Sequence, residues 1–213
     1  MVPLPNLLGF LAAAIVLVIM PGPTVLFVVG RSLALGRRGG LLSVLGNEIG
    51  MTPIVFAVAF GVGAIVASSV IIFTILKIVG AAYLVYLGIQ AIRHRKQTAA
   101  AVQNSSAAPK STLRLIGEGA LVGITNPKAI AFFVAILPQF VDPRAGWVPG
   151  QMLILGGIFV GLALISDGCW ALAAGSARDW FAKSPKRVER LGATGGVMMI
   201  GLGGVLLFTG TKS

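Results

Sequence analysis

The sequence is poor in the side chains from which soluble surfaces and most active sites are built. Only 11% of its 213 residues are charged, and it has 6 Asp and Glu, 1 His and 1 Cys. About a quarter of a soluble globular protein is normally charged, so this chain could not cover a water-exposed surface. The single Cys169 excludes an intrachain disulfide. With only His94 besides, the parts of a His/Cys metal centre or a Ser/His/Asp triad are missing, and we expect neither a metal nor enzymatic activity.

Long apolar stretches make up most of the chain instead. The hydrophobic share is 56%, and the 29 glycines suit helices that pack closely in lipid. A membrane helix needs about 20 mostly apolar residues. The sequence therefore predicts an all-α integral membrane protein, a single transmembrane domain over residues 1–213, with about six transmembrane helices: Leu4–Val29, Leu41–Ala67, Val70–Ile92, Ala120–Phe140, Val148–Ala174 and Leu191–Thr209.

The net charge of +11 comes from basic residues that lie in short segments between the apolar stretches and do not form a basic domain. We therefore expect lipid, and no nucleic acid, around this chain. The first, third and fifth connections carry three, five and five of the 17 Lys and Arg residues. The other side has only Arg144 and Lys212. Because Lys and Arg concentrate in cytoplasmic loops, the odd-numbered connections should be cytoplasmic and both termini should face outward.

Residues 93–117 form the only long connection, and their small, polar composition predicts a flexible cytoplasmic linker. This linker separates two halves of three spans each, residues 1–92 and 118–213. Three is odd, so the halves should insert with opposite orientation, as in transporters built from inverted repeats. The first span of each half contains a proline-bearing break, "MPGPT" and "ITNPK", and the second span of each half carries one carboxylate.

The first break consists of Pro21, Gly22 and Pro23. Proline lacks a backbone N–H, so Pro21 leaves the carbonyl of Leu17 without its helical hydrogen bond. Within lipid this carbonyl must find protein, water or substrate. The hydroxyl of Thr24 could cap the helix where it restarts. The alternative is that the prolines only kink the helix for packing.

The second break consists of Thr125, Asn126 and Pro127, followed by Lys128. A helix that begins there directs N–H groups and the positive end of its dipole at the break, where a carboxylate would be favoured. A kink for packing is again the alternative. Two breaks at corresponding places favour a binding role.

Two carboxylates lie inside apolar spans, Glu48 beside Asn47 and Asp167 in the fifth span. An unpaired carboxylate there is costly and usually faces a polar cavity or a partner. Either acid could instead snorkel to an interface. Lys77 and Lys128 could pair with these acids or could snorkel themselves, and the sequence does not assign the pairs. Glu48 and Asp167 are also our candidates for proton coupling.

Glycines spaced four apart occur in the fifth and sixth spans, as Gly157/Gly161 and Gly192/Gly196. We interpret both pairs as helix-packing contacts within one chain. A homo-oligomer interface is left open.

Three segments resemble the LysE/RhtB family of amino-acid exporters: "MPGPTVLFVVGRSLALGRRGGLLSVLGNEIG", "GAAYLVYLGIQAIR" and "GITNPKAIAFFVAILPQFVD". The similarity covers nearly the whole chain in order. It implies a bacterial cytoplasmic-membrane exporter with six hydrophobic segments, driven by the proton motive force. Six residues fall on the family's motif positions: Pro21, Gly22, Pro23, Asn126, Pro127 and Lys128.

The function we expect is therefore secondary active efflux of an amino acid or a close analogue, without a cofactor. No G-x-x-x-x-G-K-[ST] loop is present, which argues against ATP as the energy source. Two alternatives remain at this point: a lipid-modifying membrane enzyme and a non-transporting membrane subunit. The residues expected to bind substrate are Pro21, Gly22, Pro23, Thr24, Asn47, Glu48, Thr125, Asn126, Pro127, Lys128 and Asp167.

Overall fold

A computed structural model describes residues 2–68, 70–103, 111–177, 180 and 184–208. All regular structure in these residues is helical. The elements are α1 Leu4–Ile19, α2 Pro23–Ser68, α3 Val70–Arg93, α4 Arg95–Gln103, α5 Thr112–Ile124, α6 Pro127–Ala131, the π-helical η1 Phe132–Ile136, the 3₁₀ helices η2 Leu137–Phe140 and η3 Pro143–Ala145, α7 Val148–Ser176, and α9 Pro185–Phe208.

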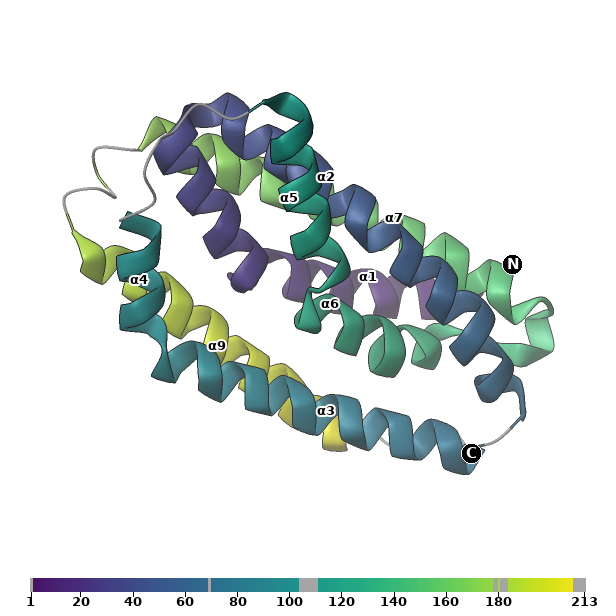
Figure 1. The fold of residues 1–213 in the computed structure, drawn as a ribbon. Coiled ribbons are helices and arrows are strands. Elements are labelled where there is room, and N and C mark those ends of the chain that lie inside the picture. Colours follow the sequence, from purple (N-terminus) through teal and green to yellow (C-terminus); the bar gives the residue numbers. More distant parts are fainter. Residues whose placement is uncertain (1, 69, 104–110, 178–179, 181–183, 209–213) are drawn as a thin grey trace.

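The helices form an elongated bundle in which α1 and α6 lie between two groups (Figure 1). One group is the pair α3 and α9. The other consists of α2, α5 and α7, where α2 packs against both of the others. The short α4 packs on α9 at the end of the bundle opposite to the N-terminus.

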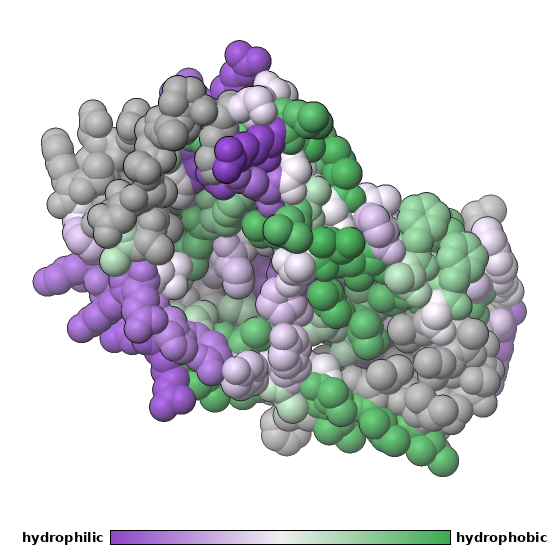
Figure 2. Space-filling model, in the orientation of Figure 1, coloured by the Kyte–Doolittle hydropathy of each residue, from purple (hydrophilic) through white to green (hydrophobic). Residues whose placement is uncertain are grey.

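The apolar helices are those of a membrane protein. Two described helices, Pro23–Gly61 and Val148–Ser176, are long and apolar enough to cross a membrane, and the bent pair Thr112–Ile124 and Pro127–Phe140 would make a third. The full set of six spans is therefore supported only in part. Figure 2 shows hydrophobic side chains over much of the visible surface and hydrophilic ones gathered toward the α4 end.

Both helix breaks lie where the prolines predict them. The helix α1 ends at Ile19, and α2 begins at Pro23. The helix α5 ends at Ile124, and α6 begins at Pro127, with a bend of 40° between the two segments. The π-helical and 3₁₀ turns that follow α6 were not predicted.

Two predicted connections turn out to be largely helical. The first one is part of α2, which continues past Val29 and changes direction at Gly36, whose φ of 75° suits glycine. In the predicted flexible linker, residues 95–103 form α4. Alanine favours helix, and Ala99 is buried against a cluster that includes Leu26 and Leu33, so packing stabilises this segment. Residues 104–110 lie outside the described part of the chain.

Glycine lets several helices approach at backbone distance. A Cβ at Gly46 or Gly50 of α2 would overlap the backbone of α5, and a Cβ at Gly119 or Gly123 of α5 would overlap that of α2. The two helices therefore interlock through four glycines, as small residues allow in membranes.

Of the four glycines predicted to form helix-packing contacts, only one packs against another helix as expected. Gly196 meets the backbone of α3, which confirms its role. Gly192 instead lines a cavity. The prediction for Gly157 and Gly161 was wrong, because both are exposed and a Cβ at either would meet nothing within 4 Å. Each lies on the outer side of α7, one helical turn from the next.

Candidate functional site

The two helix breaks contact each other in the middle of the bundle. The side chain of Asn126, at the second break, donates from Nδ2 to Oγ1 of Thr24 over 2.7 Å. The ammonium group of Lys128 donates to the carbonyl oxygens of Leu17 and Met20, at 3.0 and 2.9 Å. Side chains of one break thus bond to the end of the helix at the other.

The first break explains why Lys128 is accepted there. Pro21 cannot donate to Leu17, and the last carbonyls of any helix lack partners within it. The Lys128 ammonium supplies donors to two of these oxygens. Gly22 makes room for it, since a Cβ at Gly22 would lie 3.3 Å from Cδ, Cε and Nζ of Lys128. Lys128 is only 6% exposed, so it does not snorkel.

Asn126 caps the helix α6. Its Oδ1 accepts from the backbone N–H groups of Lys128 and Ala129, at 3.1 and 3.4 Å. These are among the N–H groups that the sequence suggested for a substrate carboxylate, and here they are bonded within the chain. The charged end of Lys128, rather than the helix terminus, is the cationic group at this break.

Two carboxylates join Lys128 from neighbouring helices. Asp167 of α7 and Glu48 of α2 are 5% and 4% exposed, so neither snorkels. Asp167 interacts electrostatically with both Lys128 and Glu48. Asn47 donates from Nδ2 to Oε1 of Glu48 over 3.0 Å. Oε2 of Glu48 and Oδ1 of Asn47 are buried and find no hydrogen-bond partner among the described residues.

Most of these polar side chains line a cavity of about 20 Å³ at the crossing of α2, α6 and α7, but Glu48 is not part of its lining. A space of this size holds about one water molecule, so the cluster is closed around itself. Apolar side chains complete the wall, and sequence reasoning missed them. Phe159 is the largest of them, and the centroid of its ring lies 4.8 Å from that of Phe132 and 4.9 Å from that of Phe133. The lining residues are Val18, Thr24, Val25, Asn47, Met51, Asn126, Lys128, Ala129, Phe159, Ala163 and Asp167.

Some predicted site residues lie outside this cluster. Thr125 is exposed, and its hydroxyl donates to the carbonyl of Leu121 over 2.6 Å. Pro127 is half-buried and begins α6, while Pro23 is exposed toward a second cavity. Lys77 belongs to α3, but its side chain lies outside the described part of the structure, so its pairing stays a prediction.

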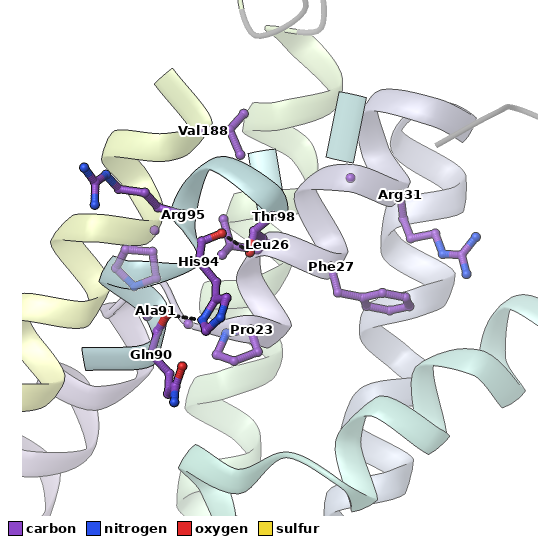
Figure 3. A pocket seen from close by; sticks show the side chains of 14 residues that line it. Pro23, Leu26, Phe27, Arg31, Gln90, Ala91, His94, Arg95, Thr98 and Val188 are labelled. Carbon is purple, nitrogen blue, oxygen red and sulfur yellow. Dashed lines mark hydrogen bonds between the residues drawn. The ribbon is translucent and has the colours of Figure 1, made fainter. Parts of the chain in front are cut away.

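The second cavity lies on the other side of the first break and is much larger, about 580 Å³ (Figure 3). Pro21 and Gly22 form its inner end, and the first part of α2, the α3–α4 junction and α9 form its walls. Its polar groups include Gln90, His94 and Arg95, which sequence reasoning missed. Gln90 was placed in the third span, and His94 and Arg95 were assigned to a charged cytoplasmic connection. The lining residues are Pro21, Gly22, Pro23, Leu26, Phe27, Gly30, Arg31, Gln90, Ala91, His94, Arg95, Thr98, Val188 and Gly192.

Broken apolar helices that enclose buried charges are typical of membrane transport proteins. The sequence matches the family model of LysE type translocators over residues 15–210, and the chain belongs to this family. An uncharacterized membrane protein of Vibrio cholerae is 36% identical over 93% of this chain and 95% of its own length. The homoserine/homoserine lactone efflux protein of Salmonella typhi is 32% identical over 93% and 94%.

A leucine efflux protein of Klebsiella pneumoniae is 28% identical over 88% of this chain and 87% of its own length. No solved structure matches the chain.

Proposed function

We propose that this protein is a secondary active exporter of amino acids or close analogues, located in the bacterial cytoplasmic membrane. The observation that carries the proposal is the buried cluster of Lys128, Asp167 and Glu48 where the two broken helices meet. Such charges inside apolar helices are costly and mark ion or substrate pathways. Membership of a translocator family and the efflux activities named for two relatives support the same function.

The cluster offers one group for each charge of an amino-acid zwitterion. A lysine ammonium has three donors, and the carbonyls of Leu17 and Met20 take two of them. The third can bind a substrate carboxylate. Asp167 and Glu48 would bind the substrate ammonium, or a proton in its place. Competition of proton and ammonium for these carboxylates couples efflux to proton entry.

The closed cavity of about 20 Å³ implies that the helices must move to admit a substrate. We propose that residues 1–92 and 118–213 are inverted repeats that rock against each other, joined by a cytoplasmic connection over residues 93–117. Both termini then face outward, and the basic residues near α4 and at the beginning of α5 and α9 face the cytoplasm. The hydrophilic end in Figure 2 supports this orientation.

The test uses inside-out membrane vesicles that contain the protein, in which export appears as uptake. An imposed proton gradient should drive accumulation of one or more radiolabelled amino acids, and an uncoupler should abolish it. Asp167→Asn and Glu48→Gln should each lower gradient-driven uptake at least tenfold. Asp142→Asn is the matched control, because Asp142 lies outside the cluster and an asparagine can still accept from Arg144 N–H. Equal uptake by all variants would refute the assignment.

A further inference from the structure

The larger cavity has the size and chemistry of a small-molecule site that the proposed central cluster does not use. Binding pockets typically enclose about 300–1,000 Å³ and combine apolar walls with a few polar groups. The cavity of about 580 Å³ falls in this range, whereas the central cavity of about 20 Å³ does not. In this conformation the larger cavity can therefore hold a small molecule, and the central cavity cannot.

The inner end of this cavity borders the charged cluster. Gly22 lines the cavity, and the stem and Nζ of Lys128 lie against Gly22 on its other side. Gly195 of α9 closes the same region, since a Cβ there would overlap the carbonyl of Pro21. Movement at the first break would connect the two spaces.

The walls are apolar on several sides, and the polar groups are uncharged or cationic (Figure 3). Leu26, Phe27 and Val188 supply apolar surface. The side chains of His94 and Thr98 each bond to a backbone carbonyl four residues earlier: Thr98 Oγ1 donates to the His94 carbonyl, and the His94 ring contacts the Gln90 carbonyl. This part of the lining therefore suits an uncharged, hydrophobic substrate side chain.

The charge of the lining is positive. Arg31 is paired with Glu118 and lies over the Phe27 ring at 5.1 Å, so its charge is offset. Arg95 donates to the carbonyl of Ile92 over 2.7 Å and forms no ion pair with any of the described carboxylates. None of the described residues that line the cavity is an acid. A cleft of one charge sign attracts anionic groups and repels cationic ones.

We infer that this cavity is a loading subsite that selects zwitterionic amino acids with an uncharged, largely apolar side chain and disfavours basic ones. The side chain packs on Leu26, Phe27 and Val188, and the ammonium stays at the opening of the cavity. The carboxylate lies at the edge formed by Arg95, whose guanidinium points away from Leu26 and Phe27 in Figure 3 and would turn toward it. A second ammonium, as in lysine, would find no acidic partner here. The inference rests on the proposed function, and it narrows that function to a substrate class.

The first experiment compares leucine with lysine, both radiolabelled, in the inside-out vesicles. Leucine uptake should exceed lysine uptake at least tenfold. Arg95→Gln should raise the ratio of lysine uptake to leucine uptake roughly fivefold. This is about the effect of removing one nearby like charge in a partly solvated site. Arg93→Gln is the control: it removes the same charge from an exposed side chain that does not line the cavity, and the ratio should not change.

A second experiment reduces the volume of the cavity. A Cβ at Gly192 would lie 3.6 Å from Leu26 Cδ1 and 4.0 Å from Arg95 Cβ, so a longer side chain extends into the space without backbone overlap. Gly192→Leu should therefore lower leucine uptake several-fold more than alanine uptake. Gly201→Leu on the same helix is the control, because a Cβ there would meet nothing within 4 Å.

The outcomes separate this inference from the function on which it rests. If no amino acid is transported by the unmodified protein, the proposed function fails and the subsite fails with it. If amino acids are transported but lysine equals leucine, the subsite alone is overturned. The same holds if Gly192→Leu reduces alanine and leucine uptake equally.

Discussion

Replacing Lys128 by methionine tests the link between the two helix breaks. The change keeps a long unbranched side chain and removes the ammonium that bonds to Leu17 and Met20. Both of these residues are fully buried, so bulk solvent does not reach their carbonyls. A buried acceptor left without a donor costs about 1–3 kcal/mol, which gives about 2–6 kcal/mol for two.

Removing a buried charge also has a favourable side, because the desolvation of the ammonium is no longer required. Asp167 then loses its cationic neighbour, which opposes that gain. We therefore expect Lys128→Met to lower the free energy of unfolding by about 3 kcal/mol and to abolish transport.

The measurement is denaturant unfolding in detergent micelles, together with amino-acid uptake by inside-out vesicles. Lys96→Met, on an exposed position of α4, is the matched control and should change neither quantity. In the double variant with Asp167→Asn, the carboxylate that lost its cationic neighbour is neutralised, so about half of the lost stability should return while transport stays absent. Wild-type transport by Lys128→Met, at any stability, would refute the role of this side chain.

Three further predictions concern the packing around the cluster. Gly50→Ala should lower the free energy of unfolding by about 2 kcal/mol, because a Cβ there overlaps the α5 backbone. Gly117→Ala is the control and should not lower it, because a Cβ at Gly117 would meet nothing within 4 Å. Thermal unfolding in detergent measures both. Asn126→Ala should cost about 2–4 kcal/mol, because it loses both the α6 cap and the bond to Thr24. Asn126→Asp keeps the capping oxygen but has no amide donor, so it should restore about half of this in the same assay. Gly195→Ala pushes α9 away from the first break and should slow vesicle uptake several-fold, whereas Gly204→Ala should not; equal uptake by these two would contradict the packing described at the break.

The sequence predicted the breaks because their cause is local. Pro21, Pro23 and Pro127 remove backbone donors wherever they stand in a helix, so the ends of α1 and α5 could be placed from the sequence. The buried acids were also predictable, because Glu48 and Asp167 stand alone in long apolar stretches and lipid tolerates them only beside a partner.

The contacts between the breaks could not be predicted in the same way. Lys128 reaches a carbonyl 111 residues earlier in the chain, and no local pattern encodes that distance. The snorkelling alternative for Lys128 was equally consistent with the sequence. The cavity beside the first break was missed for a related reason. It exists because the small, polar segment after Arg93 folds as α4 and packs on α9, and its composition suggested a flexible connection.

The bonds between the breaks also bear on how an exporter would stay closed when empty. Three hydrogen bonds join the breaks, from Asn126 to Thr24 and from Lys128 to Leu17 and Met20. At ~1–2 kcal/mol each, separating the breaks without replacement costs about 3–6 kcal/mol, so an unoccupied site opens rarely. In the proposed mechanism, the bonds that a zwitterion forms replace part of these links, since its carboxylate bonds to Lys128 and its ammonium to Asp167 or Glu48. Under the proposed function, substrate binding would then offset the cost of opening.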